Sequence, residues 1–279
     1  MAFQGKLAKW IISLMPPRET YCHFVEPYFG GGSVMLAMDP EGVSEVANDL
    51  HRDLTNFWNV IKHEHTFEAF RRVMLATPFS EVEFETARGL LSSLGFVGVP
   101  TEGDIPLAST GACVLRACNF FVVCRQAMAG RNKDFAPLSR NRTRRGMNEQ
   151  ASAWLTTVDG LPGVHARMRR VAILNRPALE VIEGQDGPKT LFYLDPPYHH
   201  DTRATTADYQ HEMSHADHVA LLATLERIQG RFLLSGYHSG LYDDWAARNG
   251  FRCEECPIVN NAAGGESKRT MTEVLWLNY

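Results

Sequence analysis

Short apolar runs with the spacing of β-strands lie in the first 50 residues of the chain and again after residue 170. They occupy residues 21–26, 43–47, 171–174, 190–194, 231–235 and 272–277. Segments with helical apolar spacing lie beside them, at residues 6–14, 54–61 and 216–228. Because short buried strands that alternate with amphipathic helices are typical of α/β proteins, the pattern predicts an α/β domain with one sheet.

The middle of the chain, residues 62–170, breaks this pattern. Residues 63–75 have amphipathic helical spacing, and the rest of the stretch combines helical and loop composition. Strand-like runs return only at residue 171. We therefore predict a sheet domain made of residues 1–61 and 171–279, interrupted by a mainly helical insertion of residues 62–170.

The strand-like run at residues 190–194 ends in Asp195-Pro196-Pro197-Tyr198, here called the tetrapeptide. Open α/β sheets bind ligands at the carboxyl ends of their strands. The prolines keep the carbonyls of Asp195 and Pro196 out of a helix, so these oxygens are available as acceptors. A carboxylate, a carbonyl and an aromatic ring suit a planar group that carries an NH2, such as a nucleobase amino group. Taken alone, the tetrapeptide is also compatible with a simple proline turn.

A glycine-rich segment follows the first strand-like run. Residues 27–33, here called the glycine loop, read Pro-Tyr-Phe-Gly-Gly-Gly-Ser. The apolar residues 34–37 come next, and we expect them to open a helix with Ser33 as its N-cap. Glycines let a ligand approach the backbone, and Glu26 and Asp49 end the first two strands beside the loop. The sequence therefore predicts a ligand site at this loop.

The two acids favour a ligand with hydroxyl groups and positive charge but no phosphate. Asp49 lies where the acid of dinucleotide sites meets ribose hydroxyls, whereas Glu26 would repel a pyrophosphate. Met35 also takes the place of the third glycine of a dinucleotide motif. S-Adenosylmethionine fits, since it has a ribose, an ammonium and a sulfonium but no phosphate. A glycine turn that binds nothing is the alternative.

Positive charge is concentrated in residues 116–176, although the whole chain has a formal charge of −4. This segment holds twelve Lys or Arg and three Asp or Glu, and eleven of the twelve are Arg. Because the planar guanidinium matches phosphate, a polyanion is the expected partner and a solvated charged face the alternative. The candidates for contact with nucleic acid are Arg125, Arg131, Lys133, Arg140, Arg142, Arg144 and Arg145.

Other features narrow the class of protein. Cys253-Glu254-Glu255-Cys256 has zinc-like spacing, but no second pair follows, so we expect no metal. Six cysteines without a secretory signal, and no apolar stretch near the roughly 20 residues of a membrane helix, predict a soluble intracellular protein. The run at residues 231–235 leads into Gly236-Tyr237, which could lie at the same sheet edge as the tetrapeptide.

Residues 26–33, Asn48-Asp49-Leu50 and the tetrapeptide together resemble the Dam-type DNA adenine N6-methyltransferases. The motifs stand in that family's order, and the resemblance extends from Gly5 to the final apolar run at residues 273–279. It implies a Rossmann-like methyltransferase sheet of seven strands, mostly parallel with an antiparallel edge strand. The insertion would hold the target-recognition elements. We expect an S-adenosylmethionine-dependent monomer that acts on double-stranded DNA in the cytoplasm.

The resemblance also implies the residues of the cofactor site. These would be Lys6, Glu26, Tyr28, Gly30, Gly32, Asp49 and Asp195. Tyr28 would lie against the cofactor and Asp49 on its ribose. Lys6 belongs to Phe3-Gln4-Gly5-Lys6, which has one glycine where the family usually has two.

The catalytic residues implied by the resemblance are Asp195, Pro196 and Tyr198. The Asp195 carboxylate and the Pro196 carbonyl would accept the two N–H bonds of adenine N6 and aim its lone pair at the methyl group. Tyr198 would stack on the base, which must leave the duplex to be reached.

The residues leave other functions open. Methylation of another planar amine, such as cytosine N4, an RNA base or a protein glutamine, would use the same acceptors. A non-catalytic DNA-binding module on a methyltransferase scaffold is a further alternative, against which the intact Asp195 and the glycine loop argue. The recognised DNA bases and a restriction-enzyme partner are not indicated, because specificity depends on a few side chains and on DNA shape.

Overall fold

The structure, a computed structural model, describes residues 2–93, 107–128, 133–198, 213–259 and 270–279. The chain divides into two compact units. Unit 1 comprises Met1–His51 and Val171–Tyr279, and unit 2 comprises Arg52–Arg170.

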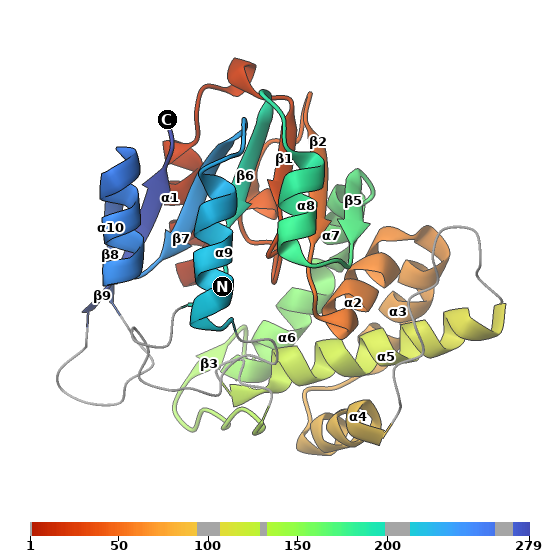
Figure 1. Cartoon of the computed structure of the whole chain (residues 1–279). Coiled ribbons are helices and arrows are strands. Elements are labelled where there is room, and N and C mark those ends of the chain that lie inside the picture. The colour runs from red at the N-terminus through yellow and green to blue at the C-terminus, as the bar shows by residue number, and fades with distance from the viewer. Residues whose placement is uncertain (1, 94–106, 129–132, 199–212, 260–269) are drawn as a thin grey trace. The chain divides into compact units, whose positions relative to one another are not determined.

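Unit 1 is built on a seven-stranded sheet (Figure 1). The strands are β1 (His23–Glu26), β2 (Ser44–Asn48), β5 (Val171–Leu174), β6 (Thr190–Leu194), β7 (Arg231–Gly236), β8 (Arg252–Val259) and β9 (Thr270–Leu277). Their order is β5-β2-β1-β6-β7-β9-β8. The pairs from β5 to β7 are parallel, and β9 is antiparallel to both of its neighbours. The predicted fold class, a mostly parallel Rossmann-like α/β sheet, is confirmed.

The edge strand β8 is paired antiparallel with its neighbour β9. β9 lies between β7 and β8, so β8 is the edge strand. The sequence pattern did not reveal β8, because it reads Arg-Cys-Glu-Glu-Cys-Pro-Ile-Val and lacks apolar alternation. Charged residues and proline are typical of edge strands. Since successive side chains of a strand point to opposite faces, Cys253 and Cys256 do not share a face as a zinc pair would.

The helices α8 (Ala178–Gln185), α9 (His215–Leu225) and α10 (Gly240–Asn249) cover one face of this sheet and lie in front of it in Figure 1. A continuous apolar core fills the space between these helices and the strands. It includes Val25, Ile182, Phe192, Leu194, Leu221, Phe232, Leu234, Trp245, Val274 and Trp276. Because side chains alternate along a strand, Tyr193, Ser235 and Glu273 lie on the opposite face.

The helix α1 (Ala2–Leu14) ends before Pro16, as the sequence predicts, and its residues Ala8 and Ile11 are buried. Arg18–Thr20 form the short 3-10 helix η1. A second one, η2 (Met35–Ala37), replaces the helix expected after the glycine loop, and Ser33 does not cap it.

Unit 2 is mainly helical. Its helices are α2 (Arg52–Lys62), α3 (Glu64–Ala76), α4 (Glu81–Ser93), α5 (Leu107–Gln126), α6 (Glu149–Asp159) and α7 (Leu161–Met168). The strands β3 (Thr143–Arg144) and β4 (Met147–Asn148) form a small antiparallel hairpin. The long helix α5 packs against α2, α3 and α4.

The helix α2 belongs to unit 2, although it falls within the residues 1–61 that the sequence pattern assigned to the sheet domain. Phe57 of α2 stacks on Phe121 of α5, with ring centroids 5.5 Å apart, and meets Phe70 of α3 edge to face at 5.9 Å. Asp53 of α2 also forms an ion pair with Arg116 of α5. Aromatic packing of this kind stabilises the association of helices beyond the area that it buries.

Candidate active site

The tetrapeptide begins directly after β6, which lies between β1 and β7. Leu194 and Pro196 are buried, whereas Asp195 between them is exposed to solvent. The protein around the carboxylate still removes much of its hydration, and this desolvation raises the pKa of Asp195 to about 6. A hydrogen bond with Tyr198 opposes the rise in pKa. Asp195 is therefore ionised at neutral pH, yet it binds a proton more readily than an ordinary aspartate.

Tyr198 connects the tetrapeptide to a carboxylate on β9. Its hydroxyl donates to Glu273 Oε1 at 2.9 Å, and the Ser235 hydroxyl donates to the same oxygen at 2.5 Å. The Tyr198 and Tyr237 rings meet edge to face, with centroids 4.6 Å apart. Residues 235–237 therefore lie beside the tetrapeptide, at the carboxyl ends of the parallel strands. The small pocket at this edge is lined by Tyr198, Ser235, Gly236, Tyr237 and Tyr242.

Glu273 is a residue of this site that the sequence analysis missed. It is 2% exposed, and burial raises the pKa of its carboxyl to about 7, with a further contribution from the charge of Asp195. The hydrogen bonds from Ser235 and Tyr198 act in the opposite direction on this pKa. Because β9 is antiparallel to β7, the first residues of β9 lie beside the carboxyl end of β7. The available signal was an acid inside an otherwise apolar final strand.

Two carboxylates hold the glycine loop in place. Glu26, at the end of β1, is 2% exposed, and its Oε1 accepts a hydrogen bond from Met35 N at 2.8 Å. Asp49 Oδ2 accepts from Gly30 N at 2.9 Å, and its Oδ1 accepts from His51 N at 2.8 Å. The carboxylate of Glu26 thus binds the start of η2, in the place expected for Ser33. Both acids have a structural function in the loop before any ligand is considered.

The backbone of the loop requires glycine at two positions. Gly30 has a φ of 49° and Gly32 a φ of 63°, a region that residues with a side chain rarely adopt. A Cβ at Gly32 would come within 2.4 Å of the Phe29 ring, which is itself buried. A Cβ at Gly30 or Gly31 would meet no atom of the described residues within 4 Å, so among these residues the backbone is open to a ligand there.

The fold brings the glycine loop and the tetrapeptide together. β1 and β6 are paired in parallel, with Val25 opposite Phe192, so the loop and the tetrapeptide leave neighbouring strands at the same edge. Tyr28 is partly buried against the core, and this burial raises the pKa of its phenol. Lys6 is exposed on α1, and no hydrogen bond or ion pair joins it to another residue in the described part of the chain.

The family model for D12 class N6 adenine-specific DNA methyltransferases matches residues 5–255. The chain belongs to this family. The match includes the glycine loop, the tetrapeptide and all of unit 2, and it confirms the resemblance to Dam-type methyltransferases. The family consists of enzymes that methylate adenine in DNA, so DNA is the substrate that membership implies. Among curated proteins, none matches the chain.

The described residues of this methyltransferase contain no group of three or more His, Cys, Asp or Glu arranged to hold a metal ion. Within the same residues, no helix has the length and apolar character needed to span a membrane.

The hairpin of β3 and β4 carries part of the basic segment of the methyltransferase. Arg145 and Gly146 form its turn, both with positive φ. The Arg145 guanidinium turns back onto α6, where it donates to the Ser152 carbonyl at 3.0 Å and to Thr156 Oγ1 at 3.0 Å. Arg144, at the end of β3, is exposed.

The other arginine candidates differ in whether they have partners within the protein. Arg125 donates to Thr157 Oγ1 at 2.8 Å, and Arg142 lies 3.6 Å from the Glu149 carboxylate in an exposed ion pair. Arg140 is exposed. Arg131 lies outside the described residues. Arg125, Arg142 and Arg145 therefore have partners within the protein.

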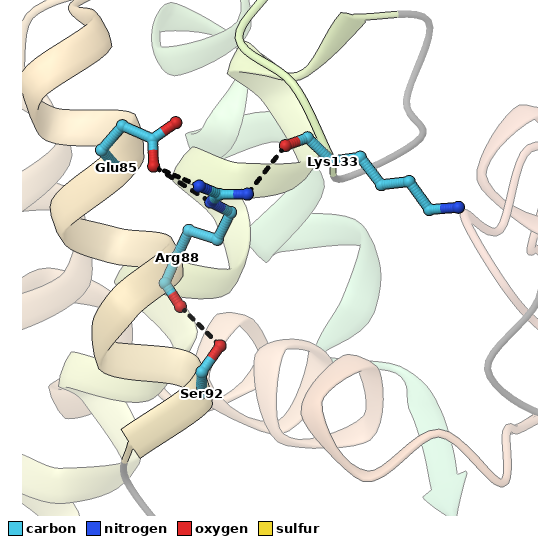
Figure 2. A network of polar contacts seen from close by, with 4 residues as sticks. All are labelled: Glu85, Arg88, Ser92 and Lys133. Atoms are coloured by element: carbon cyan, nitrogen blue, oxygen red, sulfur yellow. Dashed lines mark hydrogen bonds and ion pairs between the residues drawn. The ribbon is translucent and has the colours of Figure 1, made fainter.

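Lys133 presents its side chain away from the residues that hold its backbone. Arg88 donates to the Lys133 carbonyl at 3.0 Å and is itself bound by the Glu85 carboxylate (Figure 2). The same figure shows the ammonium group of Lys133 pointing away from this network. The backbone is thus anchored while the charge faces outward.

Proposed function

We propose that the chain transfers a methyl group from S-adenosylmethionine to N6 of adenine in double-stranded DNA, with the adenine flipped out of the duplex. The observation that supports this most is the position of the glycine loop and the tetrapeptide on the paired strands β1 and β6. A cofactor and a base bound at this edge would lie side by side, as direct transfer between them needs.

The residues of the glycine loop fit the cofactor. The backbone is open at Gly30 and Gly31, where an added Cβ meets no atom within 4 Å in the part of the chain that the structure describes. Each oxygen of Asp49 binds one backbone N–H, and a carboxylate oxygen can accept a further hydrogen bond from a ribose hydroxyl. Glu26, at the end of β1, would favour a cofactor that carries positive charge. Tyr28 would form one wall of the site, and Lys6 is a candidate on the strength of the family resemblance alone.

The cofactor, when bound, would supply an electrophilic methyl group, whose bond to the sulfonium breaks and leaves a neutral thioether. The adenine amino group is a poor nucleophile, because its lone pair is delocalised into the ring. Asp195 and the carbonyl of Pro196 would each accept one of its N–H bonds and so orient the lone pair. As N6 gains the methyl group it becomes acidic, and Asp195 receives the proton that N6 loses. Tyr198 would stack on the flipped base.

The rate of methyl transfer should depend on pH through Asp195. Its pKa is raised to about 6, and only the ionised carboxylate accepts both the N–H bond and the proton. We expect the single-turnover rate to fall as the pH falls through about 6, approaching a tenfold loss for each further unit. The measurement is a pH series with saturating DNA and cofactor, with the melting temperature recorded at each pH. A rate that stays constant down to pH 5 in folded protein would contradict this role.

Contact with DNA phosphates is the proposed function of the exposed basic side chains of unit 2. We expect the triple replacement of Lys133, Arg140 and Arg144 by alanine to weaken DNA binding. If each side chain contacts one phosphate, the slope of log K against log salt should decrease by about 2.7. Arg145 is left intact, since its guanidinium holds the hairpin to α6. Arg72→Ala, an exposed change on α3, is the matched control. An unchanged slope in the triple variant would exclude phosphate contacts at these positions.

A further inference from the structure

Glu273 is a buried acid without a basic partner. Its side chain is 2% exposed, and within the described residues no Lys, Arg or His forms an ion pair with it. Removing a carboxylate from water without a counter-charge is costly, and buried groups with such perturbed pKa values are concentrated at functional sites. Glu273 also lies beyond the residues 5–255 that the family model matches.

The partners of Glu273 lead directly to the tetrapeptide. The Tyr198 and Ser235 hydroxyls both donate to the same oxygen of Glu273, at 2.9 and 2.5 Å. The Tyr198 hydroxyl is also within hydrogen-bonding reach of Asp195 and lowers its pKa, so one phenol, with a single proton to donate, lies between the two carboxyl groups. Tyr198 and Glu273 are separated by 75 residues in sequence, so only the order of the strands brings them together.

We propose that Glu273 is a positioning residue for methyl transfer, which fixes the Tyr198 ring and its hydroxyl beside Asp195. This proposal rests on the proposed function, in which the tetrapeptide binds the flipped adenine. A phenol held at its oxygen, with its ring against Tyr237, cannot rotate out of the place where the base would stack. The Tyr198 ring is then already ordered in the free protein, so binding of the base costs less side-chain entropy.

The positioning of Tyr198 by Glu273 should depend on pH, because of the ionisable groups around Glu273. The ionisable or polar groups that face it are Tyr193, Asp195 and Tyr198 from β6 and the tetrapeptide, Ser235 from β7, and Cys256 from β8. Burial, with a smaller contribution from the charge of Asp195, raises the pKa of Glu273 to about 7, whereas the pKa of Asp195 is about 6, so Asp195 ionises first as the pH rises. Above about pH 7, an ionised Glu273 binds the Tyr198 hydroxyl more tightly and makes Asp195 a stronger proton acceptor.

A double-mutant cycle tests the proposal on the full chain with DNA and S-adenosylmethionine. Tyr198→Phe and Glu273→Ala should each reduce the single-turnover rate about tenfold, with cofactor binding measured by calorimetry unchanged. Because both changes remove the same contact, the double variant should lose about tenfold as well. Independent effects that multiply to about a hundredfold would overturn the proposal. Glu254→Gln, a half-buried acid of β8 that pairs with Arg252 at the surface, is the matched control.

A second variant keeps the test valid if Glu273→Ala does not fold. Glu273→Gln keeps the oxygen that accepts both hydroxyls and removes the charge. The folded pKa of Glu273, about 7, lies above its ordinary value of 4.5, so the wild-type fold loses stability as the pH rises between them. The Gln variant should therefore melt at an equal or higher temperature than wild type at pH 8.

The pH profile of the Gln variant separates a positioning role from a structural one. The wild-type rate should continue to rise through about pH 7, whereas the Gln variant should lack this second rise and keep only the one near pH 6. The same rise in both proteins would overturn the proposal. Asp195→Ala belongs in the same series: if it retains methyl transfer, the proposed function itself fails. If it is inactive while the cycle is additive, only the inference about Glu273 fails.

Discussion

Replacement of Asp195 by alanine is expected to reduce methyl transfer by at least about a thousandfold. The change removes an acceptor that orients the amino group and the group that receives its proton, and a general base alone contributes about 10²- to 10⁴-fold. The Tyr198 hydroxyl, the hydrogen-bond partner of Asp195, keeps its bond to Glu273, so the change leaves this hydroxyl paired and the fold should persist. The rate is measured in single turnover on DNA with labelled cofactor, and cofactor binding by calorimetry should stay within a few-fold of wild type.

Two variants sharpen this test. Asp195→Asn keeps an oxygen that accepts a hydrogen bond but cannot take up the proton, so it separates orientation from proton transfer. Asp244→Ala, an exposed acid on α10 of the same unit, is the matched control and should keep the wild-type rate. Loss of transfer together with loss of cofactor binding would assign Asp195 a structural role instead.

Replacement of Gly32 by alanine should disrupt the glycine loop and, with it, cofactor binding. A residue with a Cβ at a φ of 63° costs about 1–2 kcal/mol, and the new methyl group would lie 2.4 Å from the buried Phe29 ring unless that ring moves. We expect cofactor affinity to fall by roughly tenfold or more, and the melting temperature to fall by several degrees.

Gly31→Ala is the comparison for stability, since a Cβ at Gly31 meets no described atom within 4 Å and Gly31 is not among the glycines with positive φ. Its melting temperature should equal that of wild type. If Gly32→Ala melts at the wild-type temperature and binds the cofactor normally, neither the loop nor cofactor binding depends on this glycine.

The positions of the central strands could be anticipated from sequence, because each of them is a short apolar run with a clear end. Thr190–Leu194 is predicted within its observed bounds for this reason. β8 could not be predicted, since an edge strand with one exposed side needs little apolar character. The sequence pattern grouped the helix α2 with the sheet domain, because its apolar face shows that it packs but not on which partner. Here that partner is α5, through Phe57 and Phe121.

Some residues of the site could be predicted from the sequence and others could not. The tetrapeptide and the glycine loop are contiguous in sequence, so their positions beside each other follow once β1 and β6 are neighbours. Glu273 contributes through a contact with Tyr198 that no local pattern contains. Composition identified the basic segment but not how each arginine is used. Arg145 donates to α6 because its turn geometry directs it there, while Arg144 beside it stays exposed.

The most direct test of the account is the identity of the methylated nucleoside. Purified protein is incubated with double-stranded DNA and labelled S-adenosylmethionine, and the DNA is digested to nucleosides and separated, with RNA and protein substrates in parallel. The account predicts label in N6-methyladenine from DNA, and none with Asp195→Ala. Label in N4-methylcytosine, in RNA or in protein, or N6-methyladenine from the Asp195→Ala variant at the wild-type rate, would contradict it.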